Sequence, residues 1–481
     1  MEKRLDRYKV KKNRVVNLIH KLSARLLVIT AIHVVFTAFI VMLDNLDYDA
    51  AVSLFAFLSA MTLWVGTKIP AGYVAVSLIL FIVFMKAGKP DLLYHSFGEE
   101  VIWLMIGAFI IGEAVKESGL ADRYCQSIMN RAKDKNFIIR SLTYVLCISA
   151  FFIPSTSGRA ALSMPIVKQL GTYFSKKERD VLAVLVPIII LMSTSASLIA
   201  AGSHLIGVGF LESATGESIS FVQWIIWGAP FAIVISVLTM SIIKWMLWPK
   251  DRSMDTSPLV PLQKEKQPMS KKEKKTMLFM IVLIIGWMME SVHQYDIAFL
   301  TMVGAVLFML PKYGVISWKQ GVNAVSWNLI LFVAAAAALG RILVDSGVAG
   351  WIENEMINVL HLFANTSEWV IVLIILIVTV TSHLYITSHT TRAIVFIPAL
   401  LLFGQMISAD PVAVVFISLL GMNYCVTFPV SSKALLIFYE EGEISYQASD
   451  LLKISFVLMT LYIVVLLVFY FTYWQWTGLS I

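Results

Sequence analysis

Long apolar segments separated by short polar ones follow each other along almost the whole chain. Apolar runs of about 17 to 25 residues match the thickness of a membrane's hydrocarbon core when they are helical. The pattern predicts an all-α polytopic membrane protein with about eleven spans. They lie near 23–43, 49–66, 72–88, 98–119, 179–212, 218–247, 277–292, 297–311, 327–347, 410–438 and 451–474.

Two further apolar segments, 137–170 and 369–405, are interrupted in the middle by polar clusters. Pro154 and Gly158 in the first, and runs of Ser and Thr in both, disfavour a continuous helix. Non-helical backbone at membrane depth is tolerated only against protein or a water-filled cavity. We therefore predict that both segments are re-entrant hairpins.

The polar clusters repeat one pattern, S-x-[ST]-x-R-A-x-x-x-x-P, which starts at Ser155 and again at Ser388. Such a repeat indicates an internal duplication. Each half holds five spans and one hairpin, and this odd number of crossings would invert one half relative to the other. We predict a basic N-terminus with the first span at 1–43 and two inverted repeats at 44–248 and 277–481. A cytoplasmic linker at 249–276 would join the repeats.

At a hairpin tip, the second half-helix begins with free backbone N–H groups and the positive end of its dipole, which attract an anion. Arg159 and Arg392 lie close to these two helix starts, where a cation opposes the dipole. Arginine in a membrane segment usually faces a partner or a cavity, and its planar fork suits carboxylate, sulfate or phosphate oxygens. The hydroxyl donors at the tips are Ser155, Thr156, Ser157, Ser388 and Thr390.

Alternatives to an anion site remain open for these arginines. Each could pair with a carboxylate of the same chain, such as Glu113, or extend to the membrane interface. The sequence alone favours an arginine pair that grips a divalent anion inside the membrane.

Polar runs also break the spans 179–212 and 410–438. Unwound helix exposes carbonyls that can hold a cation and hydroxyls that can complete an anion site. Ordinary hydrogen bonding between helices is an equal alternative for each polar residue. The candidates for substrate binding are Thr427, Pro429, Ser431 and Ser432.

Composition supports the membrane assignment, because 58% of the residues are hydrophobic and only 14% are charged. The net charge of +7 does not indicate nucleic-acid binding, since the basic residues lie between spans, as the positive-inside rule requires. They predict a protein of the plasma (inner) membrane with a cytoplasmic N-terminus and an external C-terminus. The three cysteines, Cys125, Cys147 and Cys425, lack metal-ligand spacing.

At these motifs, the chain resembles the divalent-anion/sodium symporter family. That family carries a Ser-Asn-Thr motif at the tip of each of two opposed hairpins and an unwound loop in the helix that follows each hairpin. Here Ser155-Thr156-Ser157 and Ser388-His389-Thr390 occupy the tip positions. The unwound loops correspond to 198–206 and 429–433. The resemblance covers nearly the whole chain, although the motifs are degenerate.

The departures from the family pattern concern the coupling cation. Thr156, His389 and His204 stand where the family has asparagines that help to hold sodium and substrate. The resemblance implies a sodium site near Ser155, Thr156, Ala200, Gly202, His204 and His389. Extra arginine charge could replace sodium and favour exchange, uniport or proton coupling, with a histidine as the proton acceptor. Simple hydrogen bonding of these histidines within the bundle is the alternative.

The resemblance also implies a homodimer in which a transport domain moves by an elevator mechanism. The function predicted is secondary transport of a small divalent anion, such as a di- or tricarboxylate or sulfate, without a cofactor other than Na⁺ or H⁺. An oxyanion permease of the arsenite-pump type and a translocator of phosphate-bearing lipid headgroups are the alternatives. A membrane enzyme is disfavoured, because no H-E-x-x-H, G-x-S-x-G or paired-aspartate spacing supports it.

Overall fold

The computed structural model is helical throughout, and no strand occurs among the residues that it describes. The all-α prediction is therefore confirmed. Most of the predicted linker 249–276, the first 26 residues, Cys125 and Pro154 lie outside the described residues. The structure describes residues 27–43, 46–67, 69–120, 123, 134–153, 155–249, 268–348, 350–351, 367–440 and 445–481.

Helices occupy the predicted spans, commonly within a few residues of the expected ends. In the described chain, four helical segments are long and apolar enough to cross a membrane: Lys176–Ala196, Phe221–Leu247, Trp327–Asp345 and Ala448–Trp474. Shorter apolar helices fill most of the other spans, among them Leu27–Val41 and Ile297–Phe308. The number of membrane crossings stays a prediction.

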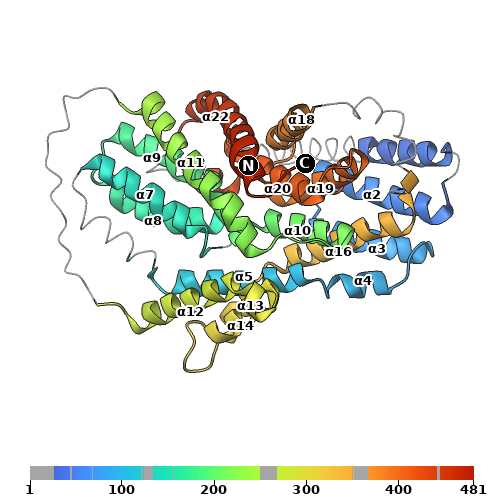
Figure 1. The fold of residues 1–481 in the computed structure, drawn as a ribbon, viewed down its shortest axis with the longest axis horizontal. Coiled ribbons are helices and arrows are strands. Elements are labelled where there is room, and N and C mark those ends of the chain that lie inside the picture. The colour runs from blue at the N-terminus through green and yellow to red at the C-terminus, as the bar shows by residue number, and fades with distance from the viewer. Residues whose placement is uncertain are drawn as a thin grey trace, which may run out of the picture. The chain divides into compact units, whose positions relative to one another are not determined.

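The chain divides into two compact units, whose helices are labelled in Figure 1. The smaller comprises Met1–Ser96 and Leu331–Glu355. Its labelled helices are α2 (Tyr48–Gly66), α3 (Ala71–Phe84), α4 (Asp91–Ser96) and the later part of α16 (Trp327–Asp345). Its core includes Ile40, Ala50, Leu54, Leu343 and Val348.

The larger unit comprises Phe97–Ile330 and Met356–Ile481. It contains one order of elements twice: a two-helix hairpin, a broken helix and a long helix. The first set is α7 (Lys135–Ser149), α8 (Thr156–Gly171), α9 (Lys176–Met192), α10 (Gly202–Thr215) and α11 (Phe221–Leu247). The second is α18 (Glu368–Thr381), α19 (His389–Met406), α20 (Pro411–Asn423), α21 (Lys433–Glu440) and α22 (Ala448–Phe469). Further helices are α5 (Glu100–Glu117), α12 (Lys271–Met288), α13 (Glu290–His293), α14 (Ile297–Phe308) and α15 (Trp318–Ala324).

The first hairpin begins and ends on one side of this unit. Lys135 at the start of α7 donates to Glu178 at the start of α9, at 2.9 Å. Only four residues separate the end of α8 from α9. Lys244 near the end of α11 donates to Asn136 at 2.6 Å, so α11 also ends there.

The second hairpin has a corresponding neighbour at its start. Glu368, the first residue of α18, accepts from Gln475 just beyond α22, at 3.0 Å. The same end of α22 reaches the start of α11, because the Trp474 indole donates to the Trp227 carbonyl at 2.9 Å. The long helices α11 and α22 therefore run in opposite directions.

The break between α9 and α10 follows from its Ser and Thr content. Hydroxyls that bond nearby carbonyls compete with the helical ladder, and both Ser193 and Thr194 donate to Ile190 of α9. Gly228 of α11 lets the backbone of the broken segment approach closely, since a Cβ there would lie 2.2 Å from the Ser195 carbonyl oxygen.

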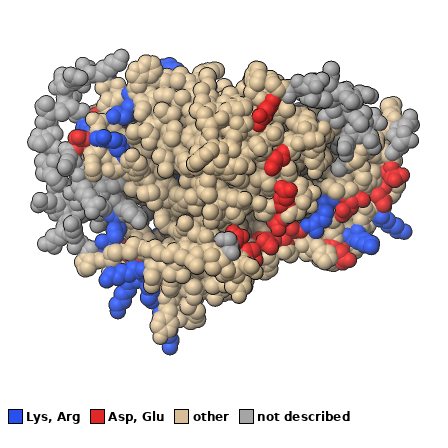
Figure 2. Space-filling view, viewed as in Figure 1, with Lys and Arg blue, Asp and Glu red and all other residues tan. Residues whose placement is uncertain are grey.

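Charged side chains are unevenly placed on the surface of the larger unit (Figure 2). Basic side chains gather at the edge where α9 and α12 begin, and the face over α11 and α20 is almost uncharged. Both of these helix starts carry capping boxes, Ser175 with Glu178 and Ser270 with Glu273. Polar caps at one end and an apolar flank are the pattern expected of membrane helices.

Candidate functional site

A cavity of about 420 Å³ lies where the two hairpin tips and the two broken helices meet. Four helices begin at its wall: α8, α10, α19 and α21. They pack in pairs across the two halves of the unit, α8 against α21 and α10 against α19. The opposite wall is formed by α5 and the start of α16, and includes Met105, Ala108, Phe109 and Leu329.

The four helix starts make the cavity positive. Each helix N-terminus carries roughly half an elementary charge and free N–H donors. Among the described residues that line the cavity, none is acidic, and Lys433 is the only Lys or Arg. A concave, mostly positive site of this size suits a small anion.

Serine caps shape both hairpin tips. Ser155 accepts a hydrogen bond from the Gly158 amide at 3.1 Å, and Ser388 accepts one from the Thr391 amide at 3.2 Å. Ser155 and Ser157 also lie 3.1 Å apart, oxygen to oxygen. Each cap satisfies one amide of the first turn, and the other first-turn amides have no intrahelical partner.

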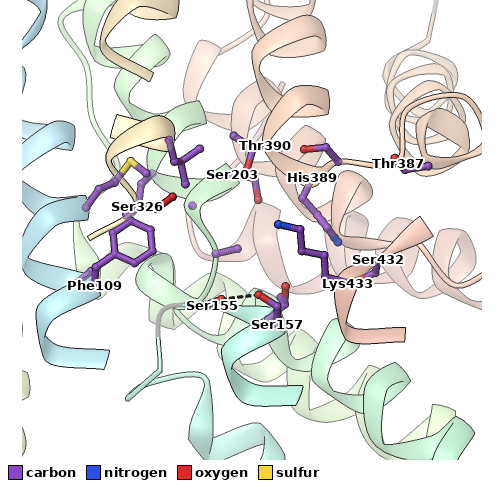
Figure 3. A pocket seen from close by; sticks show the side chains of 18 of the residues that line it. Phe109, Ser155, Ser157, Ser203, Ser326, Thr387, His389, Thr390, Ser432 and Lys433 are labelled. Atoms are coloured by element: carbon purple, nitrogen blue, oxygen red, sulfur yellow. Dashed lines mark hydrogen bonds between the residues drawn. The ribbon is translucent and has the colours of Figure 1, made fainter. Parts of the chain in front are cut away.

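Lys433 and His389 bring an amine and an imidazole to the wall of the cavity. Lys433 lies between the Ser155–Ser157 tip and the His389–Thr390 tip (Figure 3). It is exposed and has no hydrogen-bond or ion-pair partner within the described chain. His389 approaches the Cys425 sulfur through Nε2 at 3.0 Å, whereas its Nδ1 has no partner.

The two motif arginines do not line this cavity. Arg159 donates to Ser193 at 3.1 Å, to Thr194 at 2.6 Å and to the Ile190 carbonyl at 3.0 Å, all at the end of α9. Arg392 donates to the Tyr424 carbonyl, at the end of α20, at 3.1 Å. Both guanidinium groups thus supply donors to the C-terminal end of a broken helix.

Neither arginine has a carboxylate partner in the described part of the chain. Both are at most 1% exposed, and Glu113 pairs with Lys116 instead. Arg159 leaves only Nε without a hydrogen bond, whereas Arg392 leaves both Nε and Nη2 unpaired. In this structure, the two arginines bind the ends of helices. That they grip substrate stays a prediction.

Several other candidates belong to buried networks behind the cavity. The Thr427 hydroxyl lies 2.7 Å from both His383 Nε2 and Ser455 Oγ. His204 bonds the Asn423 side chain at 3.0 Å through Nε2, and so joins the two broken helices. These contacts are the interhelical hydrogen bonds that the sequence left as an alternative.

The candidates therefore fall into two groups. Those that line the cavity are Ser155, Thr156, Ser157, Gly202, Ser388, His389, Thr390 and Ser432. Those outside it are Arg159, Arg392, Thr427, Pro429, Ser431, Ala200 and His204.

Sequence reasoning missed Lys433 as a site residue, although it ends the broken segment 429–433. A lysine inside the apolar span 410–438 is as unusual as the two arginines, and this signal could have identified it. Ser203, Thr387 and Ser326, which also line the cavity, carry no comparable signal.

Comparison with known proteins assigns the chain to a family. A family described as the sodium:sulfate symporter transmembrane region matches residues 20–480. The chain belongs to this family. The predicted relationship to divalent-anion/sodium symporters is therefore confirmed, and the protein is an integral membrane transporter rather than an enzyme.

Relatives of this symporter-family chain include named dicarboxylate transporters. It is 22% identical to the sodium-dependent dicarboxylate transporter SdcS of Staphylococcus saprophyticus over 452 residues, 86% of this chain and 85% of SdcS. It is 23% identical to the L-tartrate/succinate antiporter of Shigella sonnei over 297 residues, 58% of this chain and 60% of the antiporter. A membrane protein of Cupriavidus necator is 24% identical over 80% of this chain and 76% of its own length.

The fold also has a solved counterpart. The structure of the YdaH transporter of Alcanivorax borkumensis superposes with a TM-score of 0.59 at 12% identity, covering 90% of this chain and all of that one. This likeness supports the transporter fold.

Proposed function

We propose that the protein is a secondary transporter of small di- or tricarboxylates. The observation that carries the proposal is the convergence of four helix starts and Lys433 on a single cavity, whose described lining contains no acidic residue and no partner for the lysine. The binding groups would be the hairpin-tip hydroxyls and amides for one carboxylate and Lys433 for another. The names of two relatives, which refer to dicarboxylates, tartrate and succinate, support this substrate class.

The cavity supports a dicarboxylate better than a bare oxyanion. Apart from Ser326, its polar side chains lie on the hairpins and the broken helices, while Met105, Ala108 and Phe109 make most of the opposite wall apolar. A carbon backbone between two carboxylates can cover such a wall, and sulfate has no apolar part to place there.

For coupling, we propose exchange of one dicarboxylate for another, or coupling to protons, in preference to sodium symport. Lys433 provides a fixed positive charge at the site, and His389 has a free ring nitrogen beside it. Fixed charge of this kind would neutralise substrate without a bound cation. The known relatives include both a sodium-dependent transporter and an antiporter.

We further propose that the two halves are inverted repeats and that the hairpins move together as the transport domain of an elevator. The opposite directions of α11 and α22, and the presence of hairpin starts beside opposite ends of α11, support the inversion. The homodimer rests on the family resemblance alone.

Transport by purified protein in liposomes tests the function. Vesicles loaded with unlabelled succinate should accumulate labelled succinate and L-tartrate by counterflow. A sodium gradient should add little to this uptake. A matched experiment replaces internal succinate with sulfate.

The outcomes separate the substrate from the coupling. Sulfate counterflow without succinate counterflow would overturn the dicarboxylate assignment. Succinate uptake that requires external sodium would overturn the exchange mechanism and leave the substrate assignment standing.

A further inference from the structure

A second cavity, of about 290 Å³, lies between the first hairpin and the helices α5 and α12. Its lining is almost wholly apolar, from Leu146 and Phe152 on the hairpin to Val115 on α5 and Met280 on α12. It is separate from the substrate cavity, because the two share no lining residue. A hydrophilic dicarboxylate has no place in it.

One charged group contributes to this apolar wall. Arg159 lines the cavity, is 1% exposed and keeps Nε without a hydrogen-bond partner. A buried, unpaired N–H on a cation is costly, and an acceptor that enters the cavity would remove that cost. A carboxylate would also neutralise the guanidinium charge, for which the described residues offer no acid.

The lining of the cavity includes apolar side chains that are exposed on the surface of the larger unit. Its rim includes Ile148, Met277 and Ile281, which are 51%, 40% and 47% exposed. Exposed apolar side chains on membrane helices contact acyl chains, so a ligand would enter sideways from the bilayer. An apolar cavity of about 150 Å³ holds a benzene-sized molecule, so twice that volume suits a chain of about eight to twelve carbons.

We infer that this cavity binds a medium-chain fatty acid, with its carboxylate accepting from Arg159 and its alkyl chain directed toward the rim. A bound chain would lie between the arms of the first hairpin on one side and α5 and α12 on the other. If the hairpin moves during transport, as the proposed function requires, the ligand slows dicarboxylate exchange without competing for the substrate cavity.

Binding of labelled decanoate to the purified protein in nanodiscs tests the inference. Ile281→Trp places a large ring at the mouth, and Ile285→Trp is its matched control. Ile285 lies one turn along α12, is 49% exposed, and does not line the cavity. Decan-1-ol serves as the uncharged ligand control, so the test does not depend on an arginine variant that could fail to fold.

The expected result is saturable decanoate binding to the wild type and to Ile285→Trp, and binding at least about tenfold weaker to Ile281→Trp. Decan-1-ol should bind the wild type about tenfold more weakly than decanoate, because it lacks the charge. Equal binding to all three proteins would mean simple partitioning and would overturn the inference. Equal affinity for the alcohol and the acid would overturn the role of Arg159.

This test is independent of the transport proposal. Decanoate binding is measured on the protein without substrate, so failure of succinate counterflow leaves it unaffected. Conversely, loss of decanoate binding with intact counterflow would remove only the second site.

Discussion

Replacing Lys433 with glutamine should weaken dicarboxylate binding while leaving the empty protein at least as stable as before. Lys433 is the first residue of α21, where a cation opposes the helix dipole at a cost of about 0.3–1 kcal/mol. It also has no partner in the described chain that its loss would leave unpaired. Removal of the charge therefore relieves the unliganded state and harms only the bound one.

The size of the binding loss follows from the position of the amine. Two unit charges 4 Å apart attract by about 4 kcal/mol at an effective dielectric constant of 20. The cavity is open enough to leave Lys433 exposed, so part of this energy is lost to water. A net contribution of about 1.5–3 kcal/mol, typical of a charged hydrogen bond, corresponds to an affinity about 10- to 150-fold lower.

Thermal unfolding of the purified protein across a succinate titration measures both effects at once. Lys433→Gln should melt at or above the wild-type temperature without succinate, and should need far more succinate for the same shift. Lys433→Arg should keep most of the affinity. The matched control is Lys319→Gln, because Lys319 is an exposed lysine of α15 away from the cavity.

The titration has a clear refuting result. If Lys433→Gln responds to succinate as Lys319→Gln does, the lysine does not bind substrate. The charge argument would then rest on the helix starts alone.

Three further predictions concern stability. Gly228→Ala should lower the free energy of unfolding by at least about 1–3 kcal/mol in thermal melts, because the new Cβ would lie 2.2 Å from a backbone oxygen. Gly286→Ala is the control, because its Cβ would lie 3.6 Å from the nearest side chain, and it should be neutral or stabilising in the same melts. Asn423→Leu should lower the free energy of unfolding by about 1–3 kcal/mol in a denaturant titration, since it leaves Nε2 of the buried His204 unpaired while Nδ1 keeps the Ser197 carbonyl. The Arg123 hydrogen bond lowers the pKa of Glu273, so this pair should stabilise the fold above about pH 4.3 and lose its effect as pH falls through the lower folded pKa. Melts from pH 7 to pH 3 should show that loss in the wild type and not in Glu273→Gln.

Hydrophobic length and polar interruptions were sufficient to locate the helices and the hairpins. The segment 137–170 contains two helices that meet at the Ser155 motif, and 369–405 contains two that meet at Ser388. Such breaks can be predicted from the sequence, because Ser and Thr hydroxyls compete for backbone hydrogen bonds and Pro lacks the N–H that a continuous helix needs. The two compact units were not predicted, because Leu331–Glu355 joins Met1–Ser96 through contacts between distant parts of the chain.

The sequence could predict which residues gather near the site, but not which way they point. Ser155 and Ser388 line the cavity because a cap must stand at its helix start. Arg159 and Arg392 lie four residues further along, about one turn of helix, where rotation about the axis decides which neighbour they meet. For Lys433, a lysine inside an apolar span is a signal in the sequence, but its position beside the hairpin tip depends on the packing of α21 against α8.

The positions of the arginines follow from the cost of breaking helices inside a membrane. Each break exposes carbonyls at the end of the first half-helix and N–H groups at the start of the second, and lipid can satisfy neither. Arg159 and Arg392 donate to the carbonyl ends of α9 and α20. The N–H ends, at α10 and α21, face the cavity together with those of the hairpins. Protein cations thus balance the negative helix ends, and the positive ends remain available for an anion. In this arrangement, the duplicated arginines stabilise the broken helices whose starts form the proposed dicarboxylate site.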